Sequence, residues 1–176
     1  MNANIDVRAL FHFSYGLYVV GSANNGKNNA QVANAVMQVT SDPVCIAVCL
    51  NKQNLTEEFI CGCGAFSISV LESDVPMPFI GRFGFKSGRD FNKFEGVDFE
   101  VGEALGAPML KEWCLSSMEL SLLHRMDMYT HTLFIGEVVA ARVYKEGTPL
   151  TYSDYHLLKK GKSPKTAPTF AFNALK

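Results

Sequence analysis

Four polar side chains gather where an apolar run ends and a short helical pattern begins. They are Asn51, Lys52, Asn54 and Thr56. The first N–H groups of a helix have no partner within the helix, and the helix dipole adds partial positive charge, so an anion such as a phosphate is favoured there. The alternative is that Asn54 and Thr56 only cap a surface helix while Lys52 is solvated, because such caps are common.

A second polar group consists of amides spaced along one segment, namely Gln31, Asn34 and Gln38. Each amide offers both hydrogen-bond donors and acceptors, which suits a ligand with a polar heterocyclic edge. The small residues Ala33 and Ala35 lie between them and would let the main chain approach such a ligand closely. The alternative is a polar loop between two strands.

Three cations, Lys86, Arg89 and Lys93, are interleaved with phenylalanines in residues 83–94. Such cations bind phosphate groups through charge-assisted hydrogen bonds, so the stretch suits a cofactor phosphate or an incoming nucleotide. The alternative is a solvated basic loop. No Gly-x-Gly-x-x-Gly follows a strand, so a Rossmann-type dinucleotide-binding domain is not expected.

Histidines and cysteines do not form a metal-binding pattern, because the spacings of His12, His124 and His156 match no zinc or iron arrangement. The five cysteines are an odd number and are expected to be reduced thiols. Cys61 and Cys63 are an alternative redox pair or half a metal site, although no second pair completes a tetrahedral set. No Ser-His-Asp or Gly-x-Ser-x-Gly pattern supports hydrolysis.

The elements that must position these groups are mostly strands. A turn-rich loop is expected at 22–29, a short helix at 54–60, and a long, partly helical surface loop at 79–89. Strands and helices do not alternate, which favours a closed or half-closed antiparallel barrel over a doubly wound sheet. Apolar and β-branched runs predict strands at 17–21, 44–50, 66–71 and 133–143.

Length and composition predict one folded domain. The chain has 176 residues, of which 48% are hydrophobic, enough for a single core. We expect the domain to span residues 1–158. Residues 159–176 form a basic, proline-containing extension that should be ordered only if something docks it.

Charge and hydropathy exclude several partners. Sixteen Lys and Arg against seventeen Asp and Glu give a formal charge of −1, so nucleic acid is not expected to bind. No apolar run approaches the roughly 18 to 20 residues that cross a bilayer, and the first residues lack a signal-peptide pattern. A cytoplasmic protein without a membrane partner is therefore expected.

The order of several motifs resembles a known family. Taken together, they are similar to the flavin reductase-like, FMN-binding split-barrel family, most of all to flavoredoxins and to the flavin domain of high-molecular-weight rubredoxin. The resemblance implies a mainly β, Greek-key-like antiparallel barrel with a few short helices. The segments that carry it are 31–43, 50–56, 64–71, 83–90, 93–96, 131–138 and 152–156.

The resemblance also implies a noncovalent FMN cofactor and a role for each polar group. The segment 51–56 would cradle the phosphate, and the segment 31–38 would run along the flavin ring, including the backbone of Ala33 and Ala35. His131 would face the ring edge, where a donor stabilises negative charge on reduced flavin. Hydride chemistry takes place on the flavin itself, so no dedicated acid or base is required, with His131 as the one possible exception.

As to function, the resemblance implies an NAD(P)H-dependent flavin reductase or a flavoredoxin that passes reducing equivalents through FMN, with NADH or NADPH as reductant. One alternative is an electron carrier that exchanges electrons with a rubredoxin- or ferredoxin-type protein. Another is a non-catalytic flavin- or haem-binding module. The family also implies a homodimer with the flavin buried at the two-fold interface.

Overall fold

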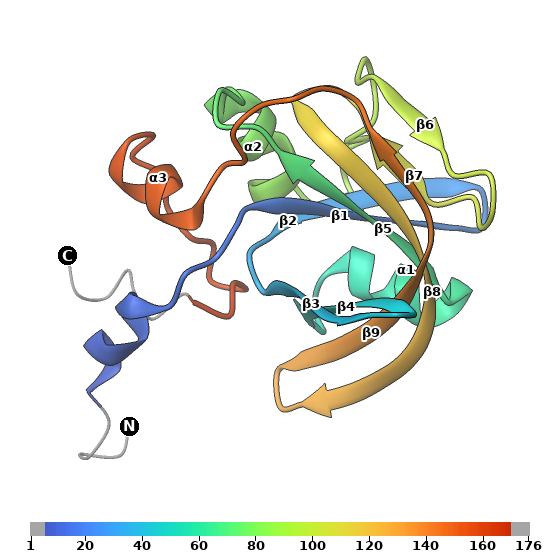
Figure 1. The fold of residues 1–176 in the computed structure, drawn as a ribbon, viewed down its shortest axis with the longest axis horizontal. Coiled ribbons are helices and arrows are strands. Elements are labelled where there is room, and N and C mark those ends of the chain that lie inside the picture. The colour runs from blue at the N-terminus through green and yellow to red at the C-terminus, as the bar shows by residue number, and fades with distance from the viewer. Residues whose placement is uncertain (1–5, 170–176) are drawn as a thin grey trace.

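The structure is a computed structural model that describes residues 6–169, and its main feature is one curled antiparallel sheet (Figure 1). Its strand order is β2-β1-β5-β8-β9-β4-β3. Only Asn34 and Ala35 separate β2 from β3, so the two edges of the sheet meet at that end and close a split barrel. The strands are β1 (Tyr18–Asn24), β2 (Lys27–Ala33), β3 (Val36–Ser41), β4 (Val44–Asn51), β5 (Ala65–Leu71), β8 (Cys114–Met128) and β9 (His131–Val143).

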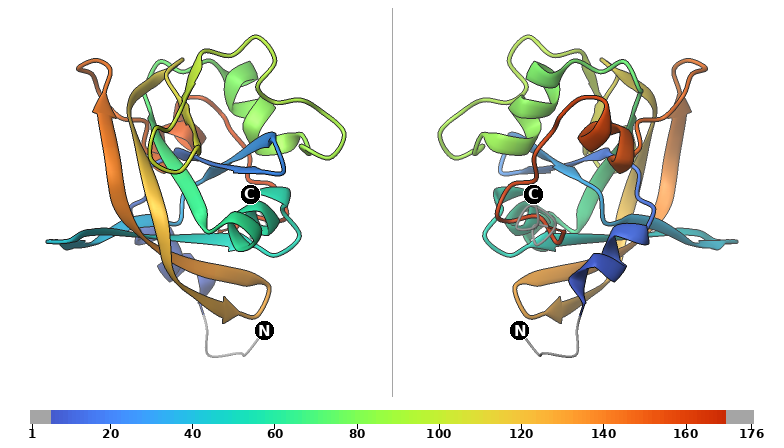
Figure 2. Two further views of the ribbon diagram at one scale, coloured as in Figure 1. Left: turned by 90° about the vertical axis from the view of Figure 1, so that its right-hand side faces the viewer. Right: turned by 90° about the vertical axis from the view of Figure 1, so that its left-hand side faces the viewer.

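Short elements surround this barrel (Figure 2). The helix α1 (Leu55–Cys63) packs against β1 and β2, and α2 (Met77–Phe85) packs against β2. These contacts place the start of α1 and the end of α2 beside the same strand. The remaining elements are η1 (Val7–His12), the small hairpin of β6 (Phe99–Val101) and β7 (Pro108–Leu110), and α3 (Tyr152–Leu157).

The sheet confirms the expected barrel and most of its predicted strands. The runs at 17–21, 44–50, 66–71 and 133–143 fall largely within β1, β4, β5 and β9, and the predicted helix at 54–60 falls on α1. A polar strand was missed, because the expected loop at 22–29 is instead a tight hairpin. Asn25 and Gly26, with φ of 49° and 72°, form its two-residue turn, and Asn24 pairs with Lys27 across it.

The segment 79–89 is partly helical, as expected, but it is not wholly a surface loop. Residues 79–85 belong to α2, which buries Phe79, Ile80 and Phe83. The glycines of this segment suggest a break, but the helix continues through Gly81 and Gly84 to Phe85. A Cβ at Gly84 would make ordinary van der Waals contact with Val32 at 3.6 Å, so packing against β2 does not require this glycine.

The apolar interior forms two clusters on either side of β1. One fills the barrel and contains Phe66, Leu120 and Phe134, all fully buried. The other lies under α2 and α3 and contains Phe83 and Tyr152. The candidate site lies where these two clusters meet.

Candidate functional site

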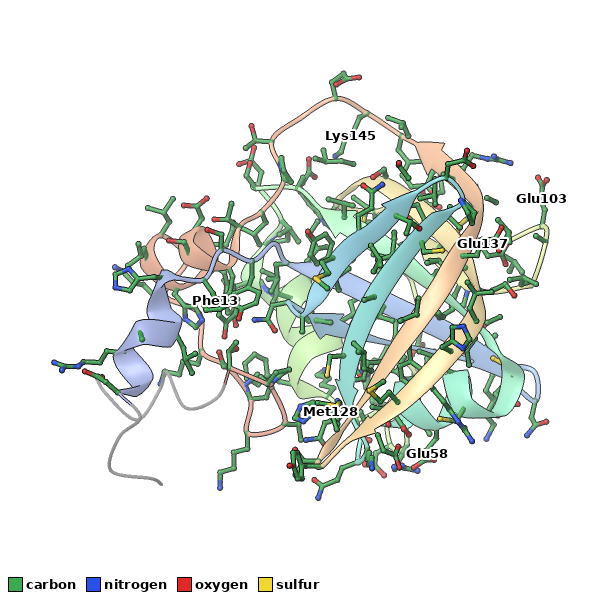
Figure 3. The ribbon with its side chains drawn as sticks, turned by 60° about the horizontal axis from the view of Figure 1, so that its bottom comes forward. Phe13, Glu58, Glu103, Met128, Glu137 and Lys145 are labelled. Carbon is green, nitrogen blue, oxygen red and sulfur yellow. The ribbon has the colours of Figure 1, made fainter. Side chains whose placement is uncertain are left out.

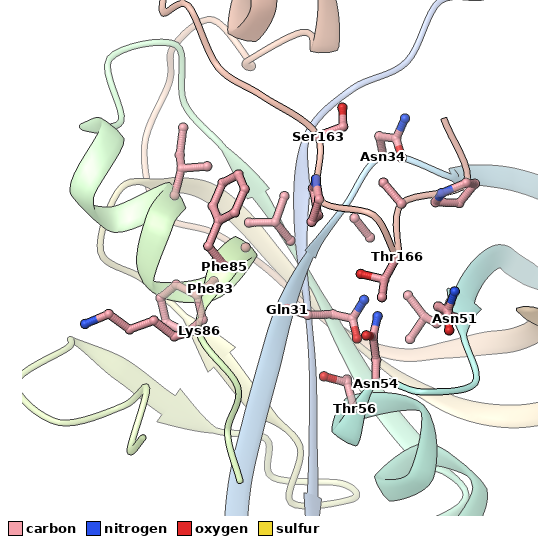
Figure 4. Close-up of a pocket in the computed structure, with 18 of the residues that line it drawn as sticks. Gln31, Asn34, Asn51, Asn54, Thr56, Phe83, Phe85, Lys86, Ser163 and Thr166 are labelled. Carbon is pink, nitrogen blue, oxygen red and sulfur yellow. The ribbon is translucent and has the colours of Figure 1, made fainter. Parts of the chain in front are cut away.

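A cavity of about 340 Å³ opens between β2, the end of β4, the start of α1, the end of α2 and residues 162–168 (Figure 4). Leu17, Ile80 and Phe83 come from one apolar cluster and Leu50 from the other. The cavity also collects eight of the residues that the sequence predicts for a site. These are Gln31, Ala33, Asn34, Asn51, Asn54, Thr56, Lys86 and Lys93.

The start of α1 forms one side of the cavity. Asn54 is the N-cap residue, yet its side chain makes no capping hydrogen bond, and it points into the cavity (Figure 4). Thr56 is buried in the first turn, where its Oγ1 accepts a hydrogen bond from Asn29 Nδ2 at 2.8 Å. The interpretation of Asn54 as a mere helix cap therefore finds no support in the contacts of its side chain.

Two acids also lie in the first turn of α1, but neither lines the cavity. Glu57 accepts a hydrogen bond from Thr132 Oγ1 at 2.6 Å, and Glu58 is paired with Arg89. Both carboxylates are thus engaged elsewhere. The helix dipole and the free N–H groups at this end of α1 remain suited to an anion in the cavity.

The adjoining wall is β2 and the bend after it, joined to the first turn of α1 by the Asn29–Thr56 hydrogen bond. Gln31 points into the cavity, and its buried Oε1 has no hydrogen-bond partner among residues 6–169 (Figure 4). Since buried polar atoms are nearly always paired, this oxygen is an acceptor available to a ligand. Asn34 is buried, and its Nδ2 donates to Thr169 Oγ1 at 3.2 Å.

The place of Lys93 among charged residues suggests a solvated cationic loop, but the structure does not show one there. Lys93 is buried, and its Nζ donates to the carbonyl oxygens of Ala30 at 2.8 Å and Phe83 at 3.3 Å. Burial lowers the pKa of this ammonium to about 8. Lys93 thus ties β2 to the end of α2 and forms the back of the cavity.

The other two cations of this group diverge. Lys86 is one of the cavity residues, but the end of its side chain points away from the cavity (Figure 4). Its ammonium lies 3.9 Å from the centre of the Phe91 ring. Arg89 is exposed, pairs with Glu58 and is not among the cavity residues. Lys86, Arg89 and Lys93 therefore do not act together as one phosphate-binding cluster in this structure.

Four further predicted residues lie outside the cavity. The Gln38 amide donates to the Thr40 carbonyl on the exposed face of β3, and Lys52 forms an ion pair with Asp127 at 3.4 Å. The Ala35 carbonyl accepts from the Cys49 N–H at 3.0 Å. His131 starts β9, where its Nε2 is 3.3 Å from the Thr166 carbonyl oxygen. It thus contacts the segment that walls the cavity.

The C-terminal wall was missed by sequence reasoning. Tyr152 and Tyr155 of α3 line the cavity, together with residues of the segment 162–168. The basic and proline-containing composition of this segment predicts an extended tail, whereas the structure has turns at residues 165–166 and 168–169. Composition carries no information about where the segment packs. The part of the extension beyond residue 169 lies outside the described residues.

The described residues contain neither a cluster of metal-ligating side chains nor a disulfide bond. No group of three or more His, Cys, Asp or Glu in residues 6–169 is arranged to hold a metal ion. All five cysteines are free, and Cys61 and Cys63 lie on α1 without a bond between them. No helix within this range is long and apolar enough to cross a membrane.

The cavity fits a phosphorylated, planar ligand such as FMN. It offers apolar walls, an anion-binding helix start, and an unpartnered buried acceptor at Gln31 Oε1. Its volume lies near the lower end of the roughly 300 to 1,000 Å³ of small-molecule sites. Flavin binding needs these same features: a phosphate partner, amide-type partners and ring faces.

Residues 10–160 match the family described as "Flavin reductase like domain", and the chain belongs to this family. The barrel and the site above thus define a flavin reductase-like split-barrel protein.

Three known proteins illustrate the likeness. A ferric-chelate reductase (NAD(P)H) of Archaeoglobus fulgidus is 49% identical over 94% of this chain and 98% of its own length. A high molecular weight rubredoxin of Moorella thermoacetica is also 49% identical, over 94% of this chain and 72% of its own length. The structure of a flavoredoxin from Methanosarcina acetivorans superposes with a TM-score of 0.71 at 26% identity, covering 85% of this chain and 78% of that one.

Proposed function

We propose that this protein is an NAD(P)H-dependent flavin reductase that holds FMN noncovalently in the cavity between β2, α1 and α2. The observation that carries the proposal is one cavity that combines a helix start, a buried, unpartnered amide oxygen and apolar side chains. The similarity to a reductase named for NAD(P)H supports the reductant. A single helix start at the cavity suits the one phosphate of a mononucleotide.

The residues would divide the work of holding the cofactor. The first N–H groups of α1 and the Asn54 amide would bind the phosphate, while Gln31 would pair with the polar edge of the ring. Phe83 and Leu50 supply apolar contacts. Bound FMN would accept hydride from the nicotinamide and pass on electrons, so the protein's own task is to bind, orient and exclude water.

A second candidate, an electron carrier for a protein partner, is favoured by charge beside the cavity. Lys159, Lys160, Lys162 and Lys165 lie within seven residues, and Lys162 lines the cavity. None of the four has a carboxylate within 4.0 Å in the described part of the chain. Such a rim suits an acidic protein of the rubredoxin or ferredoxin type.

Anaerobic stopped-flow mixing tests the proposed function. FMN-loaded protein should lose its flavin absorbance rapidly when mixed with NADH or NADPH, because hydride transfer needs only orientation of the two rings. Reduction by a reduced ferredoxin or rubredoxin alone would move the protein to the carrier class. Bound flavin that neither donor reduces would contradict both candidates and favour a non-catalytic module.

We also propose a homodimer in a reducing, cytoplasmic setting. Exposed apolar side chains gather on β3 and at the tip of the β8–β9 hairpin, with Met37 at 66%, Met126 at 60% and Tyr129 at 94% exposure. Met128 lies at this tip (Figure 3). A patch of this kind suits a self-complementary contact. Sedimentation should give a dimer mass at micromolar concentration, and a 19.4 kDa species would contradict this expectation.

A further inference from the structure

Residues 161–169, which we call the strap, run across the cavity from the end of α3. Lys162 is among the strap residues that line it. Ser163 and Thr166 also line it (Figure 4). The strap takes no part in sheet pairing. In the described part of the chain its backbone N–H groups make two hydrogen bonds, from Ala167 to the Pro164 carbonyl within the strap and from Gly161 to the Tyr155 carbonyl at its start. Beyond Gly161, the bonds that attach the strap to the rest of the protein involve side chains.

On the α3 side, two tyrosines hold the strap. The Tyr152 hydroxyl is hydrogen-bonded to Ser163 Oγ and, at 2.7 Å, to Thr169 Oγ1. The Tyr155 hydroxyl donates to the Lys162 carbonyl at 2.8 Å. Tyr152 thus joins the beginning and the end of the strap through one oxygen atom.

On the far side, the strap reaches two residues that the sequence assigns to the flavin. Asn34 Nδ2 donates to Thr169 Oγ1 at 3.2 Å, and His131 Nε2 is 3.3 Å from the Thr166 carbonyl oxygen. These polar groups are engaged by the strap. A ligand that used either of them would have to displace it.

The size of the cavity leads to the same conclusion. With the strap as one wall, it has about 340 Å³, which suits one mononucleotide but not a flavin together with a nicotinamide dinucleotide. We propose that the strap is a gate that must open for each ligand to enter or leave, and that Tyr152 is the positioning residue that latches it. This inference rests on the proposed function only in naming FMN as the ligand.

A gate and a static wall differ in their kinetics. Loosening a gate makes the open state more populated in both the free and the bound protein, so association and dissociation both become faster and the affinity changes little. Weakening a static wall removes contacts from the bound state alone, so dissociation becomes faster while association does not change.

The test measures FMN association and dissociation rates in the full-length protein by stopped-flow flavin fluorescence. Tyr152→Phe keeps the buried ring and removes the latching hydroxyl, and Thr169→Val breaks the link to Asn34. Both variants should raise both rates about fivefold or more and leave Kd within about twofold. Tyr144→Phe is the matched control, since its hydroxyl bonds Glu100 Oε1 at 2.9 Å away from the cavity.

Rates equal to those of the Tyr144→Phe control, or a rise in dissociation alone, would overturn the gate. If the parent protein binds no FMN, the proposed function fails, and hydrogen–deuterium exchange without ligand then decides about the strap. The Ala167 amide should exchange much faster than the amides of β4, and faster still in Tyr152→Phe. Protection equal to that of β4 would overturn the gate without reference to flavin.

Discussion

Lys93→Met should lower the free energy of unfolding by about 2 kcal/mol at pH 7, and the deficit should grow in alkaline solution. The substitution leaves the carbonyls of Ala30 and Phe83 buried without their donor, and each unpaired group costs about 1 to 3 kcal/mol. Loss of a buried charge offsets part of this cost at pH 7. Chemical denaturation of both proteins at several pH values measures the difference.

The direction of the pH effect follows from the lowered pKa of Lys93. The unfolded chain keeps this proton up to a pKa near 10.5, whereas the folded protein releases it at about 8. Between these values the unfolded state binds more protons, so this group's contribution to parent stability rises with pH. The gap between parent and Lys93→Met should therefore widen by about 3 kcal/mol from pH 8 to 10.5.

Lys86→Met provides the control for this experiment, because the Lys86 ammonium is exposed and lies over the Phe91 ring. Lys86→Met should lower the free energy of unfolding at pH 7 by less than Lys93→Met does, because no buried carbonyl within residues 6–169 loses its donor. A pH-independent gap for Lys93→Met would show that Lys93 is solvated, as a basic loop residue would be.

Asn54→Ala should weaken FMN binding about tenfold, equivalent to about 1.4 kcal/mol, with little change in the stability of the apo protein. The Asn54 side chain points into the cavity and makes no capping hydrogen bond, so the helix loses little when it is removed. A titration of FMN into the apo variant, followed by quenching of flavin fluorescence, measures the affinity.

Arg89→Ala is the matched comparison for Asn54→Ala. Arg89 lies near the same helix but pairs with Glu58 at the surface, outside the cavity, so its removal should leave FMN affinity within about twofold. Equal effects of the two substitutions would contradict the position assigned to the phosphate. A loss of apo stability in Asn54→Ala without loss of affinity would return Asn54 to the role of a helix cap.

The elements that were predicted correctly are those whose own residues carry a strong local pattern. The apolar run of β4 and the acidic first turn of α1 each carry their own signal, and both elements lie where expected. The polar strand β2 carries no such signal, because its formation depends on the turn at Asn25 and Gly26 and on pairing with β1. The glycines of α2 suggest a loop, whereas the helix buries Phe79, Ile80 and Phe83 in the core, which only the tertiary structure reveals.

The candidate site was predictable where its residues are neighbours in the chain. Asn51, Asn54 and Thr56 lie together at the junction of β4 and α1, and the structure brings them to the cavity. Lys93 and the strap were not predictable in this way. Whether a lysine is solvated or bonded to buried carbonyls depends on contacts between distant parts of the chain. The bond from Lys93 to Ala30 joins residues that are more than 60 positions apart in the sequence.

The most direct test of the central claim compares FMN with riboflavin, which has the same ring system and polyol but no phosphate. If the cavity holds FMN with its phosphate at the start of α1, FMN should bind to the apo protein in a 1:1 ratio and remain after desalting. Riboflavin should bind at least about tenfold more weakly, since charge-assisted hydrogen bonds contribute about 1.5 to 3 kcal/mol. Equal affinities for the two flavins, or no retained flavin, would contradict the account.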